Sequence, residues 1–101
     1  MFADKAISFG NHVLIGWNVS IRDCDGHSVM HNNLLKENIK EVTIGDSVWI
    51  AAEAHILKGT YISANSIVAY RATVLGKFEE PNSLIGGFPA KVLQRNVSWH
   101  K

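Results

Sequence analysis

The sequence has one cysteine, almost no net charge and no long apolar run, and each of these absences narrows what the protein can be. Because Cys24 is alone, no disulfide can form within the chain, which fits a reducing compartment. The formal net charge of +1 lacks the basic excess of a general nucleic-acid binder. No apolar run approaches the roughly 18 residues that span a bilayer. The first residues, 1–5, do not resemble a signal peptide. These features predict a cytoplasmic protein that engages neither nucleic acid nor membrane.

What is present is an apolar content of 47% over 101 residues, enough for the packed core of one domain, residues 1–101. Its main feature is a six-residue repeat. Every sixth residue from 44 onwards is a β-branched aliphatic: Ile44, Ile50, Ile56, Ile62, Val68 and Val74. Four places after each of the first five comes a small or β-branched residue: Val48, Ala54, Thr60, Ser66 and Ala72. The aliphatic register also holds earlier in the chain, at Phe9, Ile15 and Ile21.

A period of six matches neither the 3.6-residue period of a helix nor the two-residue alternation of a strand. It predicts short strands joined by bends, three to each triangular coil, with the aliphatic side chains stacked inside. An ordinary β-sandwich is disfavoured because its strands do not keep one register through six repeats. The fold class is therefore all-β, a parallel β-helix of hexapeptide repeats.

Two segments interrupt this pattern. Ile21 and Ile44 are 23 residues apart, which is not a multiple of six, so the polar segment at about 23–41 leaves the coil as a loop. Its apolar pair, residues 34–35, packs either on its own coil or on a neighbouring subunit. The repeat is expected to end at Phe78, followed by a tail over about 78–101 in which Pro89 opens a short helix.

Histidines are the first candidates for chemistry. His12 and His55 lie outside the inward positions of the repeat and should point outward. His27 stands where the chain leaves the coil, and Asp23 and Asp25 precede it. A carboxylate near one ring nitrogen fixes the tautomer and leaves the other nitrogen to accept a proton. The residues alone leave two readings open for His27, a surface histidine or a catalytic base.

Several segments resemble the hexapeptide-repeat acetyltransferases: residues 44–50 (IGDSVWI), 56–59 (ILKG) and 86–92 (GGFPAKV). Within that family the chain is similar to the galactoside and maltose O-acetyltransferases and to acetyltransferases that act on capsule or lipopolysaccharide sugars. Residues 26–31 (GHSVMH) resemble the branch's Gly-His-x-Val-x-His segment, in which the first histidine is catalytic. The likeness extends from about Ile7 to Val97 and implies a left-handed parallel β-helix.

The resemblance implies an acetyl-CoA-dependent O-acetyltransferase whose acceptor is a hydroxyl of a sugar or saccharide. His27 would take the proton from that hydroxyl as its oxygen attacks the thioester carbonyl. Acetyl-CoA is then a co-substrate, with no metal and no bound cofactor. Because no acyl-enzyme is expected, Cys24 is not assigned as a nucleophile.

The resemblance also assigns contacts with CoA, which lies in a groove between neighbouring subunits of a homotrimer. The backbone near Ala51 and Ala52 would meet the pantetheine arm, with Tyr70 further along. Lys91 is either a phosphate contact or a solvated surface lysine. Lys77 is displaced by one position from the family's lysine and is expected to reach the same anion.

The sequence departs from the family pattern at three places. Ala51 replaces a glycine, residues 75–76 (Leu-Gly) replace Thr-Lys, and Phe88 stands where a small or polar residue usually precedes Pro89. Family enzymes also carry coils before the position of Phe2 that contact the acceptor, so this sequence is expected to be a fragment, a truncated product or a minimal member.

Two other functions fit parts of the pattern. A γ-type carbonic anhydrase shares the fold but binds zinc through three histidines, two of them closely spaced within the repeat. Here His27 and His31 lie in the loop, and His55 has no histidine within five residues. A non-catalytic β-helix used only for assembly fits the short N-terminal part, whereas His27 and residues 89–91 (Pro-Ala-Lys) argue against it.

Overall fold

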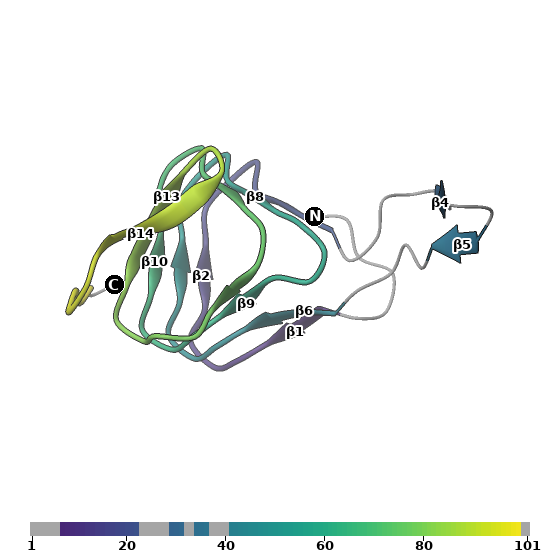
Figure 1. The fold of residues 1–101 in the computed structure, drawn as a ribbon. Helices are drawn as coiled ribbons and strands as arrows, with labels where there is room; N and C mark the ends of the chain where they lie inside the picture. Colours follow the sequence, from purple (N-terminus) through teal and green to yellow (C-terminus); the bar gives the residue numbers. More distant parts are fainter. Residues whose placement is uncertain (1–6, 23–28, 32–33, 37–40, 100–101) are drawn as a thin grey trace.

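The structure is a computed structural model that describes residues 7–22, 29–31, 34–36 and 41–99. The chain winds into a three-sided prism in which short strands lie side by side on flat faces (Figure 1). Three full coils are formed by β1 (Ile7–Phe9), β2 (Leu14–Ile15) and β3 (Ser20–Ile21); β6 (Val42–Ile44), β7 (Trp49–Ile50) and β8 (His55–Ile56); and β9 (Tyr61–Ile62), β10 (Ile67–Val68) and β11 (Thr73–Val74). A partial fourth coil contains β12 (Lys77–Phe78) and β13 (Leu84–Gly87), and β14 (Ala90–Gln94) follows it.

Each face of the prism collects one strand from each coil. The first face has the order β1-β6-β9-β12, the second β2-β7-β10-β13 with β14 outermost, and the third β3-β8-β11. Neighbouring strands are parallel on all three faces, except that β14 runs antiparallel to β13. The prediction of a parallel β-helix with three strands per coil is confirmed.

The predicted aliphatic columns form the core. Ile44 pairs with Ile62 on the first face, Ile50 with Val68 on the second, and Ile56 with Val74 on the third. Partners are eighteen residues apart, three repeats of six, and all six side chains are at most 1% exposed. Burial of each such side chain stabilises the fold by about 1.5–3 kcal/mol relative to exposure. In the first coil Phe9 and Ile15 keep the same register but are 40% and 37% exposed.

The predicted excursion is present. Phe9 pairs with Ile44, 35 residues later, against 18 for a regular coil, so the extra residues leave the prism between Arg22 and Glu41. Within them β4 (Val29–His31) and β5 (Leu34–Lys36) pair antiparallel, and they lie outside the prism (Figure 1).

The fourth coil lies inside the segment that the sequence assigned to the tail. Phe78 pairs with Ile62, and Ile85 pairs with Val68, so both continue the inner columns. Sixteen residues separate Ile62 from Phe78, because the corner before β12 is two residues shorter than the others. Gly76 has a φ of 115° at this corner, which a residue with a Cβ adopts only with strain. The six-residue spacing therefore breaks before Phe78 as expected, but the coil itself continues through β13.

The short helix predicted after Pro89 is wrong. The Phe88–Pro89 turn, with a cis peptide bond, reverses the chain, and β14 returns along β13. β13 would otherwise leave a row of unpaired backbone groups at the end of the second face, and β14 satisfies them. Ala90 is 8% exposed in this hairpin. The described residues contain no helix, and so none long and apolar enough to cross a membrane.

Candidate functional site

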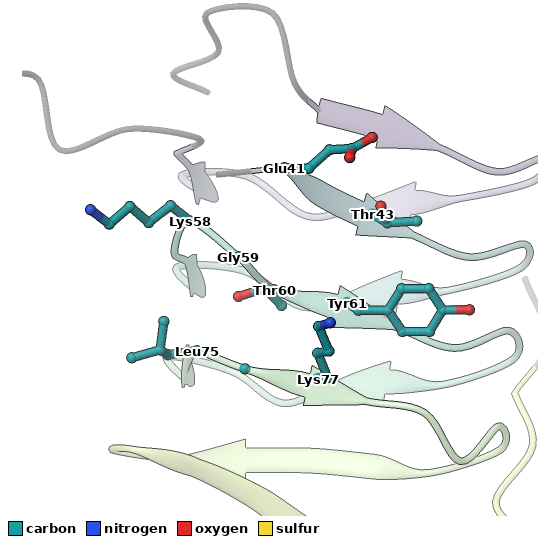
Figure 2. Close-up of a pocket in the computed structure, with 9 residues that line it drawn as sticks. Glu41, Thr43, Lys58, Gly59, Thr60, Tyr61, Leu75 and Lys77 are labelled. Carbon is teal, nitrogen blue, oxygen red and sulfur yellow. The ribbon is translucent and has the colours of Figure 1, made fainter. Parts of the chain in front are cut away.

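A groove of about 600 Å³ follows the edge where the third face turns into the first (Figure 2). We call it the Lys77 pocket. It is lined by Glu41, Thr43, Lys58, Gly59, Thr60, Tyr61, Leu75, Gly76 and Lys77.

Three of these side chains form a row because their strands are in register. Thr43 pairs with Tyr61, and Tyr61 pairs with Lys77. Each directly precedes an inward residue of its strand, and because successive side chains alternate between the two sides of a strand, all three face outward. Neighbouring strands lie about 4.8 Å apart, so Lys77 and Tyr61 have adjacent backbones, while the Tyr61 hydroxyl points away from the Lys77 ammonium (Figure 2).

The corner under this row is fixed by Thr60. Its side-chain hydroxyl donates to the carbonyl oxygens of Leu57 at 2.7 Å and Val74 at 3.1 Å. These bonds join two successive coils, and Thr60 is only 1% exposed. Lys58 and Lys77 both line the pocket, but their ammonium groups point in different directions (Figure 2), which leaves Lys77 as the candidate contact for an anionic group such as a phosphate.

Lys77 lines the pocket although it stands one position after the lysine of the family pattern. The family's lysine position is Gly76 here, and a Cβ added at Gly76 would meet nothing within 4 Å. Lys77, one residue on, enters the pocket from β12 (Figure 2). Its contact with a phosphate remains a prediction.

A second candidate region lies at the edge between the second and third faces. We call it the Tyr70 edge and define it by Trp17, Ala51, Ala52, Tyr70 and Phe88. Its middle has only the small side chains of Ala51 and Ala52, and Gly16 packs against them: a Cβ added to Gly16 would lie 2.7 Å from the amide nitrogen of Ala52. Its aromatic residues are open, with Trp17 77%, Tyr70 56% and Phe88 85% exposed.

The side chain of Tyr70 is held in place by its neighbours. Its hydroxyl donates to Glu53 Oε2 at 3.1 Å, and Arg71 Nε donates to Glu53 Oε1 at 3.2 Å. The guanidinium carbon of Arg71 lies 5.2 Å from the centre of the Tyr70 ring. The hydrogen bond to Glu53, followed by the nearby charges of Tyr70 and Glu53, raises the pKa of Arg71 above its ordinary value.

The structure brings some of the predicted site residues together and separates others. Ala51 and Ala52 follow β7, and Tyr70 follows β10 one coil further on, so these three share one edge. Lys77 lies across the third face, at the other edge. Lys91 lies on β14, pairs with Gly86, and does not line the Lys77 pocket.

Thr43, Tyr61 and Lys58 were not predicted as site residues from the sequence. Thr43 and Tyr61 are eighteen residues apart and directly precede aliphatics of the repeat, so their shared outward row was readable. Lys77 breaks that spacing, and only the shortened corner brings it into the row. Lys58 stood in the recognised segment 56–59 without a role.

His27, the predicted base, lies outside the described residues, so its role remains a prediction. The excursion that carries it starts and ends at the edge of the Lys77 pocket, since Arg22 follows β3 and Glu41 lines the pocket. In the parts of the chain that the structure describes, no three His, Cys, Asp or Glu side chains gather into a group that could hold a metal ion.

Comparison with known proteins connects this geometry to a family. No protein-family profile matches the chain. Galactoside O-acetyltransferase from Escherichia coli strain K12 is 32% identical over 95 residues, which cover 90% of this chain and 45% of that protein. The structure of a polysialic acid O-acetyltransferase superposes with a TM-score of 0.92 at 31% identity, over 98% of this chain and 49% of the other. The chain's relatives are hexapeptide-repeat O-acetyltransferases.

This family has the left-handed β-helix, so the predicted handedness is confirmed along with the resemblance. A galactoside acetyltransferase solved in complex with coenzyme A superposes with a TM-score of 0.76 at 26% identity, over 89% of this chain and 45% of the other. The chain spans about half the length of the relatives it matches.

Proposed function

We propose that this protein transfers an acetyl group from acetyl-CoA to a hydroxyl of a sugar or saccharide, with His27 as the general base. The similarity to O-acetyltransferases named for galactoside and polysialic acid supports a saccharide acceptor. The coenzyme A complex of a family member supports acetyl-CoA as the donor. Acetyl transfer of this kind fits the cytoplasm, the compartment suggested by the single cysteine.

The observation that carries the proposal is the pair of complementary regions on opposite edges of the third face. The Tyr70 edge has only small side chains between its aromatic residues, which suits a flexible amide-bearing arm such as pantetheine. The Lys77 pocket offers the ammonium of Lys77 to a phosphate. When the Tyr70 edge of one copy faces the Lys77 pocket of the next, one CoA contacts both. A head-to-tail contact of this kind is compatible with the closed threefold symmetry of the proposed homotrimer, which would then have three shared sites.

The proposed chemistry is a direct transfer. The imidazole of His27 accepts the proton of the acceptor hydroxyl while the oxygen attacks the thioester carbonyl. Collapse of the tetrahedral intermediate breaks the carbon–sulfur bond, and the imidazolium returns its proton to the departing CoA thiolate. A histidine that is neutral near pH 7 suits both steps.

The test is an acetyl-CoA turnover screen against sugars and nucleotide-sugars that follows the release of free thiol. His27→Ala should lower kcat by about 10²–10⁴-fold, the usual contribution of a general base. The matched control is His12→Asn, because His12 has a φ of 61°, which asparagine tolerates. Wild-type turnover by His27→Ala would refute the assignment. If the wild-type chain fails to bind acetyl-CoA even at millimolar concentration, the assembly scaffold becomes the better interpretation.

A further inference from the structure

Glu53 and Arg71 occupy equivalent corner positions on neighbouring coils of the Tyr70 edge. Both have a left-handed backbone, with φ of 60° and 62°. The equivalent residue of the first coil is Asn18, with a φ of 56°. Asparagine adopts this conformation readily, whereas long side chains such as those of glutamate and arginine do so at a cost. The corner itself therefore does not favour Glu53 and Arg71, and their side chains must supply the reason for their presence.

A contribution to the stability of the fold does not explain why Glu53 and Arg71 occupy these corners. The side chains of Arg71 and Glu53 are 68% and 37% exposed, and an ion pair this open to water adds little to stability. What the pair does is local. The two oxygens of Glu53 accept separate hydrogen bonds, one from the Tyr70 hydroxyl and one from Arg71, while the Arg71 guanidinium lies over the Tyr70 ring. Two contacts thus restrain the exposed Tyr70 side chain, and the third joins the two residues that make them.

We propose that Glu53 and Arg71 are positioning residues that fix the Tyr70 ring beside Ala51 and Ala52, and so shape the surface that the CoA arm contacts. This inference rests on the proposed function. A ring that is ordered before the ligand arrives costs no rotamer freedom on binding, and the gain appears as affinity.

The restrained Tyr70 ring also limits which ligands can lie along the Tyr70 edge. Trp17 is on the first coil and Tyr70 on the third, so their backbones are two coil spacings apart, about 10 Å. Ala52 lies between them with no large side chain. Exposed aromatic residues on the two outer coils, with only a small side chain between them, suit an extended chain of methylenes and amides. Pantetheine has that form, and loosening Tyr70 should weaken its binding.

The test uses Glu53→Asn and Arg71→Asn, because asparagine removes the contacts to Tyr70 but suits the left-handed backbone. Both variants should fold, with a Tm equal to or above that of the wild type. Calorimetric titration with CoA should show a Kd raised about five- to tenfold, and KM for acetyl-CoA should rise with kcat nearly unchanged. Tyr70→Phe should weaken binding in the same direction, and combining it with Glu53→Asn should add little.

The matched control is Arg95→Asn, which breaks the exposed ion pair between Arg95 and Glu80, 2.9 Å apart, away from the Tyr70 edge. Its Kd for CoA should equal that of the wild type. If the wild-type chain binds CoA and Glu53→Asn binds it equally well, the positioning role is overturned while the proposed function stands. A lower Tm with an unchanged Kd would assign the pair a structural role and also overturn the inference. If the wild-type chain does not bind CoA, both proposals fail.

Discussion

Trp99 packs against Trp49 fifty residues earlier in the sequence, with ring centroids 5.9 Å apart and planes inclined by 43°. The indole nitrogen of Trp99 donates to the carbonyl oxygen of Ser47 at 2.8 Å. Before it, the Val97 amide donates to the Asn82 carbonyl at 2.9 Å, and the Asn82 side chain donates to the Val97 carbonyl at 3.3 Å. These contacts return the C-terminal segment from the fourth coil to the second.

Removing this contact should measurably destabilise the prism. Trp99→Ala loses the aromatic pair and the hydrogen bond to Ser47, so the free energy of unfolding should fall by about 1–3 kcal/mol in a urea titration. Trp17→Ala is the control, since Trp17 is 77% exposed, and its effect should stay within about 0.5 kcal/mol. Equal effects of the two substitutions would show that the Trp49–Trp99 contact does not secure the segment.

Lys77 should contribute more to CoA affinity than Lys91 does. Lys77 shares the pocket with Lys58 and Tyr61, whereas Lys91 lies on β14 outside it. Lys77→Ala should raise the Kd for CoA by about three- to tenfold, and the difference from wild type should shrink as salt is added. Lys91→Ala should change the Kd less than twofold. A larger loss of CoA affinity with Lys91→Ala than with Lys77→Ala would indicate that the hairpin, and not the pocket, contacts the phosphate.

A shared site predicts complementation between two variants impaired in CoA binding. Ala52→Arg should block the Tyr70 edge, and Lys77→Ala should weaken the pocket, so each alone binds CoA more weakly than the wild type. In trimers refolded from an equal mixture, about one quarter of the sites should combine an intact edge with an intact pocket. Titration of the mixture should recover that fraction of binding, and sedimentation velocity should report a trimer. Absence of recovery would place both regions of each site on a single subunit.

The inner columns were predictable because each strand imposes the same local rule. Ile44, Ile50 and Ile56 are six residues apart because each strand together with its corner takes up six residues. This spacing is visible in the sequence without any long-range information. The excursion was predictable for the same reason, as a break in that count. The Glu53–Arg71 pair also had a readable signal, two opposite charges eighteen residues apart, which went unused.

Other features could not be read in this way. Phe78 joins the column over Ile62 only because the corner at Gly76 is short, and corner length is set by how two coils pair rather than by local preference. Pro89 suits the first turn of a helix, yet β13 had unpaired backbone groups that a returning strand could satisfy. The local preference yielded to hydrogen bonding across the fold.

By itself the sequence determined the repeating coil, its interruption and the family to which its motifs point, since all three depend on residue type and spacing along the chain. The tertiary structure decided which edge each candidate residue occupies. It placed Lys77 beside Tyr61, with Ala52 and Tyr70 at the opposite edge of the third face. It also packed Trp99 against Trp49. Those relationships arise from the stacking of coils, where residues distant in the chain become neighbours through backbone pairing.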